Sequence, residues 1–84
     1  MSTPVALITG AARRIGAEIS RTFHNNGFDV ALHYNHSRQD VETLANELNA
    51  IRENSASIYQ APLTDTGAIR TMVEEVLNWR GKLN

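Results

Sequence analysis

The chain has 84 residues, of which 42% are hydrophobic and 20% are charged, and its formal net charge is −1 at pH 7. This charge balance excludes the basic surface with which proteins hold a nucleic-acid backbone. The absence of cysteine excludes disulfides and thiol chemistry. No apolar run approaches the roughly 18 residues of a membrane span, and residues 1–4 have no basic signal-peptide segment. We therefore expect a cytoplasmic globular chain with a small-molecule ligand, and neither nucleic acid nor membrane as a partner.

The chain is organised around a short apolar run that breaks into a turn of small residues and then opens a helix. Residues 5–9 predict a buried parallel strand, because the run is apolar on both faces and too short for a helix. Gly10 allows the sharp turn at the end of this strand. Gly16 lacks the Cβ that would hold the following helix away from the strand.

Three helices are predicted from apolar residues at helical spacing. The residues expected to face the core share that spacing: Ile15, Ile19, Thr22 and Phe23 in the first helix, Val41, Leu44, Ala45, Leu48 and Ile51 in the second, and Ile69, Met72, Val73, Val76 and Leu77 in the third. Ser37 with Asp40 predicts a capping box at the start of the second helix. Thr64 or Asp65 is expected to cap the third helix, and Gly81 to end it.

Two further strands are predicted over residues 28–34 and 55–60, and residues 82–84 would begin a fourth. Right-handed crossovers place the β-α-β-α-β-α elements in strand order 3-2-1, with the turn at Gly10 at the switch point of a doubly wound parallel sheet. A sheet that stops there leaves its first strand with an unpaired edge. We therefore interpret residues 1–84 as the N-terminal portion of a single Rossmann-like α/β domain, truncated before its fourth strand.

The glycine turn and the first helical residues predict a site for phosphate groups. The first amides of a helix have no partner inside it, and the helix dipole adds partial positive charge there. The residues expected to contact the phosphates of a cofactor are Gly10, Arg13, Arg14, Ile15 and Gly16. The alternative is an ordinary strand-to-helix turn with two solvated arginines. A P-loop is excluded, because no Gly-Lys-Ser/Thr sequence is present.

The residues that follow the second strand favour NADPH over NADH. An NAD site places an acidic residue here to bond the ribose 2′-hydroxyl, and this chain has none at that position. The expected cofactor contacts are instead neutral or potentially cationic: His33, Tyr34, Asn35, His36 and Ser37. A 2′-phosphate would be bound by the Ser37 hydroxyl, by helix amides and by Arg38 or His36. The alternative is that Ser37 only caps a helix and the histidines are loop residues.

The pattern Thr-Gly-x-x-x-Arg-x-Gly at residues 9–16 resembles the cofactor turn of short-chain dehydrogenases/reductases, specifically the pteridine reductases, in which arginine replaces the middle glycine. Residues 33–37 resemble the His-Tyr-x-x-Ser segment of the same enzymes, and residues 79–83 resemble their approach to the fourth strand. The likeness covers all 84 residues. It implies an NADPH-dependent, homo-oligomeric parent enzyme acting on a pterin or folate, in which Arg14 approaches both the cofactor phosphates and the pterin.

Two positions depart from the family that the chain resembles. Pro62 stands where related reductases usually have an aspartate that bonds the adenine amino group, and proline offers neither that acceptor nor an amide hydrogen. The amide of Leu63 could still contact the adenine ring. Asp65 could supply the acceptor, but we favour its role as a helix cap. His36 stands where the family often carries arginine, which would weaken the contact to a 2′-phosphate.

The resemblance also implies where catalysis would occur. Hydride transfer in this family uses a tyrosine and lysine pair on a later helix, so we expect no catalytic residue in residues 1–84. The alternatives are another NADPH-dependent carbonyl or ketoacyl reductase of the same family, or a non-catalytic nucleotide-binding fragment. No metal is expected. The three histidines, His24, His33 and His36, do not have the spacing of zinc ligands, and no carboxylate or cysteine accompanies them to complete a zinc site.

Overall fold

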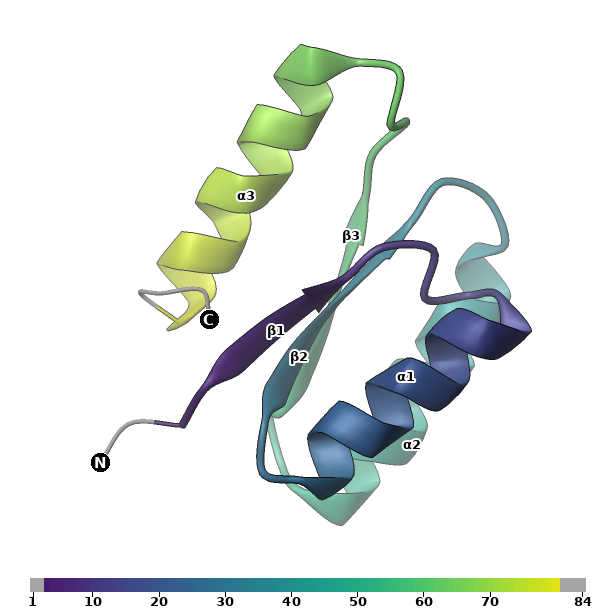
Figure 1. Ribbon diagram of the computed structural model, residues 1–84, viewed down its shortest axis with the longest axis vertical. Helices are drawn as coiled ribbons and strands as arrows, with labels where there is room; N and C mark the ends of the chain where they lie inside the picture. The colour runs from purple at the N-terminus through teal and green to yellow at the C-terminus, as the bar shows by residue number, and fades with distance from the viewer. Residues whose placement is uncertain (1–2, 81–84) are drawn as a thin grey trace.

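The computed structural model describes residues 3–80 as three parallel strands that alternate with three helices (Figure 1). The elements in chain order are β1 (Val5–Ile8), α1 (Arg14–Asn25), β2 (Asp29–Tyr34), α2 (Arg38–Ile51), β3 (Ala56–Gln60) and α3 (Thr66–Arg80). This order confirms the predicted β-α-β-α-β-α pattern. The predicted helix stop at Gly81 and the start of a fourth strand at 82–84 lie outside the described residues.

The sheet has the order β1-β2-β3, which is the predicted 3-2-1 order read from the other edge. Both strand pairs are parallel: Ile8 lies opposite Leu32, and Tyr34 lies opposite Gln60. The carboxyl ends of all three strands therefore lie at the same end of the sheet, where the strand-to-helix loops begin (Figure 1).

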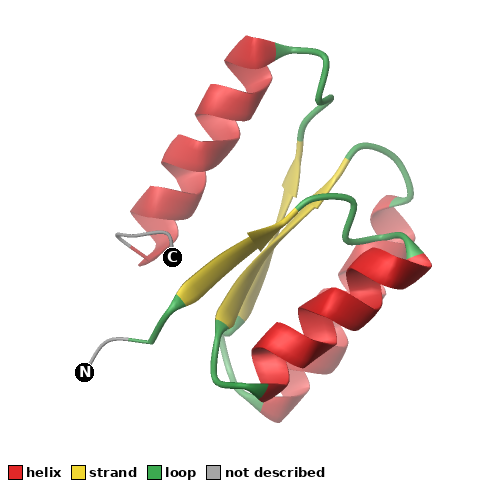
Figure 2. Ribbon diagram, viewed as in Figure 1, coloured by secondary structure: helices red, strands yellow, loops and turns green. Residues whose placement is uncertain are grey.

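The helices form layers on both faces of the sheet: α1 and α2 lie on one face and α3 lies on the other (Figure 2). Successive residues of a strand point to opposite faces, so Ala6 and Ile8 join the core under α1 and α2, whereas Val5 packs with Val76 of α3. The central strand β2 is buried along its whole length. Among the helices in residues 3–80, none combines the length and the apolar character needed to cross a membrane.

The predicted buried face of α1 is wrong. Ile15, Ile19 and Phe23 are 75%, 43% and 38% exposed, and Thr22 is exposed as well. The helix instead turns Gly16, Ser20 and His24 inward. Small and hydrogen-bonding side chains occupy the inner face because the helix begins very close to the turn before it: the Ser20 hydroxyl folds back to donate to the Gly16 carbonyl at 2.7 Å.

The buried faces of α2 and α3 match the predictions more closely. Val41, Leu44, Ala45 and Leu48 are buried as expected, but Ile51 in the last turn of α2 is 71% exposed. In α3, Met72 and Val76 are buried and Ile69 and Val73 are half-buried, whereas Leu77 is exposed. The strands follow the predicted ranges with ends that differ by one residue.

At the amino ends of the strands, the buried polar residues His24, Asp29 and Ser55 share hydrogen bonds with the half-buried Arg52. The His24 ring lies with Nε2 2.6 Å from the Ser55 hydroxyl oxygen, and that hydroxyl donates to the Arg52 carbonyl at 2.5 Å. The Arg52 guanidinium donates to the Phe28 carbonyl at 2.6 Å and to Asp29 Oδ1 at 3.2 Å. This cluster joins the end of α1, the start of β2 and the end of α2. We call it the basal network.

Candidate functional site

The turn between β1 and α1 has the backbone geometry that its glycines predicted. Gly10 has φ of +64°, in the left-handed region that glycine enters without strain. A Cβ added to Gly16 would lie 2.2 Å from the Gly10 carbonyl oxygen and 3.0 Å from Ala11 Cα. Both neighbours are backbone atoms, so only glycine allows α1 to begin this close to the turn.

The start of α1 carries amides without an acceptor inside the helix. The first intrahelical bond runs from the Ala17 amide to the Arg13 carbonyl at 2.8 Å, so the amides of residues 14–16 precede it. No side chain caps this helix, and its first turn contains no acidic residue. Amides and a positive dipole end of this kind favour an anion, and the predicted phosphate contacts stay a prediction.

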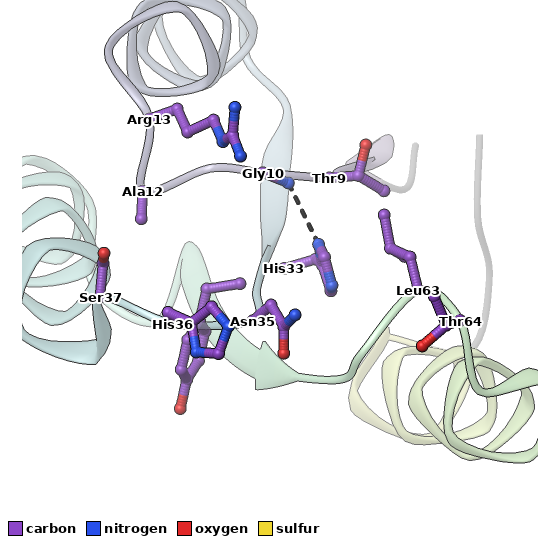
Figure 3. Close-up of a pocket in the computed structure, with 11 residues that line it drawn as sticks. Thr9, Gly10, Ala12, Arg13, His33, Asn35, His36, Ser37, Leu63 and Thr64 are labelled. Atoms are coloured by element: carbon purple, nitrogen blue, oxygen red, sulfur yellow. Dashed lines mark hydrogen bonds between the residues drawn. The ribbon is translucent and has the colours of Figure 1, made fainter.

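A hollow of about 510 Å³ lies at the carboxyl ends of the strands, between the loops that follow β1, β2 and β3 (Figure 3). Its lining comes from all three loops: Thr9, Gly10, Ala12, Arg13, His33, Tyr34, Asn35, His36, Ser37, Leu63 and Thr64. None of these described lining residues is acidic. The hollow therefore brings together eight of the residues predicted to contact a cofactor: Gly10, Arg13, His33, Tyr34, Asn35, His36, Ser37 and Leu63.

The other three predicted residues lie outside this lining. Gly16 is buried beneath the turn, where it sets the distance between α1 and β1. Arg14 and Ile15 line a separate apolar groove along α1, together with Ile19 and Phe23. Arg13 is thus the arginine of the turn that faces the hollow, and in Figure 3 its side chain reaches back over Gly10.

The predicted capping box at the start of α2 is wrong. Ser37 precedes the helix with φ of +59°, a left-handed conformation, and its side chain makes no capping bond. The Asp40 amide bonds instead to the Ser37 carbonyl at 3.1 Å. In this geometry the Ser37 hydroxyl is not held by the helix that it precedes. Ser37 lines the hollow beside His36, across from Arg13 (Figure 3).

His33 is not a loop residue but lies buried in β2, and both its ring nitrogens have backbone partners. The Gly10 amide donates to Nδ1 at 3.1 Å, and Nε2 lies 2.7 Å from the Ala61 carbonyl oxygen. The ring therefore joins the turn after β1 to the end of β3. Sequence reasoning missed this arrangement, because no local pattern shows that a histidine will meet backbone groups 23 and 28 residues away.

Arg38 already has side-chain partners. Its guanidinium donates to Glu42 Oε1 at 2.5 Å and to the Tyr34 hydroxyl at 3.1 Å. The bond to Glu42, with further contributions from Tyr34, raises the pKa of Arg38 above its ordinary value. An anion in the hollow would have to compete with Glu42 for this exposed side chain.

The loop after β3 supplies the third side of the hollow through Leu63 and Thr64 (Figure 3). The Asp65 amide donates to the Pro62 carbonyl at 3.1 Å, which closes a turn here. Asp65 Oδ1 accepts a hydrogen bond from the Ala68 amide at 3.0 Å. This contact confirms Asp65, of the two predicted candidates, as a cap of α3, and Asp65 does not line the hollow.

Comparisons with known proteins all point to the same family. A sequence model of the short chain dehydrogenases matches residues 4–84. Pteridine reductase 1 from Leishmania tarentolae is 50% identical over 64 residues, which are 76% of this chain and 22% of that protein. Hydroxynaphthalene reductase from Aspergillus fumigatus is 34% identical over 84 residues, which are 100% of this chain and 30% of that protein.

A third relative is a reductase that is named for a different substrate. The 3-oxoacyl-(acyl-carrier-protein) reductase of Staphylococcus aureus is 34% identical over 82 residues, which are 98% of this chain and 33% of that enzyme. The chain thus spans between 22% and 33% of the length of these curated relatives. All three are named as reductases, and they differ in the substrate that each name gives.

Proposed function

Because the chain belongs to the short-chain dehydrogenase family, we propose that residues 1–84 are the nucleotide-binding portion of an NADPH-dependent reductase. The observation that carries the proposal is the hollow at the carboxyl ends of the strands, with a glycine turn and a helix N-terminus on one side. Parallel α/β sheets bind nucleotides at the carboxyl ends of their strands, next to the point where the strand order reverses.

The groups around the hollow fit a dinucleotide. The amides at the start of α1 and the charge of Arg13 suit the pyrophosphate. The loop at residues 35–37 suits the adenosine ribose, and Leu63 offers an apolar contact for the adenine. When bound, NADPH supplies the hydride. The residues of this chain bind and orient it, and the tyrosine and lysine implied by the family resemblance would lie in a later part of the polypeptide.

The preference for NADPH follows from the loop after β2. A carboxylate there would accept a bond from the 2′-hydroxyl of NADH and repel a 2′-phosphate. The described lining has no carboxylate, and it has the Ser37 hydroxyl, which the helix does not use, beside His36 and across from Arg13. These are donors that a phosphate can accept from.

For the substrate, we propose a pterin or dihydrofolate. The 50% identity to a pteridine reductase supports this choice, as does Arg14, the first residue of α1, for which the family resemblance implies a position near the pterin. Its place on α1, away from the nucleotide hollow, leaves its side chain available for a second ligand. The alternative is a carbonyl or ketoacyl substrate, which the similarity over nearly the whole chain to a 3-oxoacyl reductase supports.

The first measurement is the intact mass of the protein expressed from its native coding sequence, under denaturing conditions. A mass well above 9.3 kDa would show that the 84 residues belong to a longer protein, and the assays then use that protein. A mass of 9.3 kDa would contradict the proposal of a larger reductase and leave nucleotide binding as the function to test. With a larger protein, oxidation of NADPH is then followed with dihydropterin, dihydrofolate and a ketoacyl thioester as competing substrates.

Cofactor choice is tested with Asn35→Asp, which places the missing carboxylate in the loop after β2. We expect this variant to weaken NADPH binding by about tenfold, roughly 1.4 kcal/mol, because the new charge repels the 2′-phosphate, and to strengthen NADH binding, because the carboxylate accepts a bond from the ribose 2′-hydroxyl. Fluorescence titration measures both affinities. Asn46→Asp, on the exposed surface of α2, is the matched control. Equal affinities of the unaltered protein for NADPH and NADH would contradict the proposed preference.

A further inference from the structure

The hydrogen bonds of His33 define the protonation of its ring. The Gly10 amide can only donate, so Nδ1, 3.1 Å away, must be the unprotonated acceptor. The Ala61 carbonyl can only accept, so Nε2, 2.7 Å away, must carry the proton. A neutral ring with its hydrogen on Nε2 satisfies both partners, and no other form does. The residue is only 2% exposed, so the ring is largely shielded from water.

These two bonds join the loops that lie beyond the ends of the strand pairing. The pairing of β1 with β2 ends at Ile8 and Leu32, and that of β2 with β3 ends at Tyr34 and Gln60. Beyond these ends the His33 ring links the glycine turn at one side to Ala61 at the other. The backbone of β2 adds one bond on each side, from Ala11 to the His33 carbonyl at 2.9 Å and from Ala61 to the Tyr34 carbonyl at 3.1 Å.

We propose that His33 is a positioning residue for the nucleotide site. Its neutral ring holds the glycine turn and the loop after β3 at a fixed separation, and both segments line the hollow. With both nitrogens bonded to the backbone, the ring has no donor left for a phosphate, so it acts through the groups that it holds. The inference rests on the proposed nucleotide-binding function.

Two substitutions separate the halves of this arrangement. The side-chain oxygen of asparagine lies about where Nδ1 lies in histidine, so His33→Asn can still accept from the Gly10 amide but cannot reach Ala61. The amide nitrogen of glutamine lies about where Nε2 lies, so His33→Gln can still donate to Ala61 but offers Gly10 no acceptor. His33→Phe keeps a buried ring and loses both bonds.

The experiment measures the dissociation constant of NADPH and the free energy of unfolding for the full-length protein and its variants. We expect His33→Phe and His33→Gln to weaken NADPH binding by about tenfold, and His33→Asn to stay within about threefold of the unaltered protein, because the Gly10 bond positions the phosphate turn. The matched control is His24→Phe, a second buried histidine, in the basal network. It should lower stability and leave the affinity unchanged.

If His33 contributed only to stability and did not position the nucleotide site, the variants would behave differently. The three His33 variants would then lose stability together while those that fold bind NADPH as the unaltered protein does, and this outcome would overturn the inference. Nitrogen-15 NMR of the imidazole in the unaltered protein gives an independent readout, which decides the matter where variants fail to fold. We expect the signature of a neutral Nε2–H ring, and a charged or Nδ1–H ring would overturn the proposal.

The two proposals can fail separately. If the unaltered protein binds no NADPH, the proposed function fails, and the arrangement is then tested by hydrogen exchange at Gly10. We expect faster exchange in His33→Gln than in His33→Asn. If the unaltered protein binds NADPH and the affinities of all variants agree, only the role of His33 fails.

Discussion

Two buried histidines lie at opposite ends of the sheet, and their surroundings differ. His33, at the carboxyl end of β2, bonds to the backbone of the neighbouring loops. His24, at the end of α1, lies 2.6 Å from the hydroxyl of Ser55 in the basal network. Each side chain is at most 3% exposed. At both ends, therefore, a histidine ring connects segments that are distant in the sequence.

The difference lies in where the remaining polar groups point. In the basal network, the Arg52 guanidinium bonds to the Phe28 carbonyl and the Asp29 carboxylate, and the Ser55 hydroxyl bonds to the Arg52 carbonyl. These groups satisfy one another. At the carboxyl end, the first amides of α1 and the Ser37 hydroxyl have no partner within the adjoining helix. The polar groups at one end therefore bond to one another, whereas those at the other end are the donors that we propose bind the nucleotide.

The largest effect is expected from Gly16→Ala at the carboxyl end. The added Cβ would meet the Gly10 carbonyl oxygen at 2.2 Å, so α1 must move away from the turn. We expect the free energy of unfolding to fall by about 3 kcal/mol and NADPH binding to weaken as well. Urea unfolding and fluorescence titration measure the two quantities.

The control is Gly67→Ala, in the first turn of α3, where the nearest neighbour of an added Cβ is the Asp65 carboxylate at 3.3 Å. Alanine favours a helix over glycine, so its stability should stay within about 1 kcal/mol of the unaltered protein. Similar losses for the two variants would show that the close approach at Gly16 is not what shapes this end of the fold.

A smaller effect is expected from Arg52→Met, which keeps a long apolar stem and removes the donors of the basal network. The Phe28 carbonyl and the mostly buried Asp29 carboxylate lose a charged partner, so stability should fall by about 2 kcal/mol. NADPH affinity should not change, because the hollow lies at the other end. Arg70→Met, on the exposed face of α3, is the control and should change stability by less than about 0.5 kcal/mol. Weakened NADPH binding in Arg52→Met would contradict the separation of the two ends.

Much of the fold could be predicted from the sequence, because its signals are local. The apolar runs and glycines predicted the order of strands and helices, and the left-handed turn at Gly10 and the close approach at Gly16 followed from the missing side chain. The carboxyl ends of the parallel strands then bring eight of the eleven predicted site residues to one hollow, without Arg14, Ile15 and Gly16. Whether those residues contact a cofactor stays a prediction.

The errors arose where the answer depends on distant neighbours. Periodicity showed that α1 has an apolar side, but the close approach at Gly16 turned Ser20 and His24 inward and left Ile15 exposed. The sequence around Ser37 matched a capping box, but its left-handed backbone directs the helix bond to its carbonyl instead. The role of His33 depends on Gly10 and Ala61, which only the folded sheet brings beside it.

The smallest effect is expected from pH, acting on the basal network through His24. Burial, and then the charge of Arg52, lowers the pKa of this histidine below its ordinary 6.5, although Asp29 opposes the shift. As the pH falls below about 6.5, the unfolded chain takes up a proton that the folded state resists, so the folded state loses stability. The contribution is complete above the unfolded value and declines toward the lower folded value.

His24→Gln removes this titration, and its amide can still bond to the Ser55 hydroxyl. We expect the free energy of unfolding to fall more steeply between pH 7.5 and pH 5.5 in the unaltered protein than in the variant. The difference in slope cannot exceed about 1.4 kcal/mol per pH unit, the limit for one proton. Parallel profiles would show that the His24 ring takes up its proton as readily in the fold as outside it. The basal network would then be accessible to water. The two ends of the sheet would no longer differ in how well their polar groups are shielded.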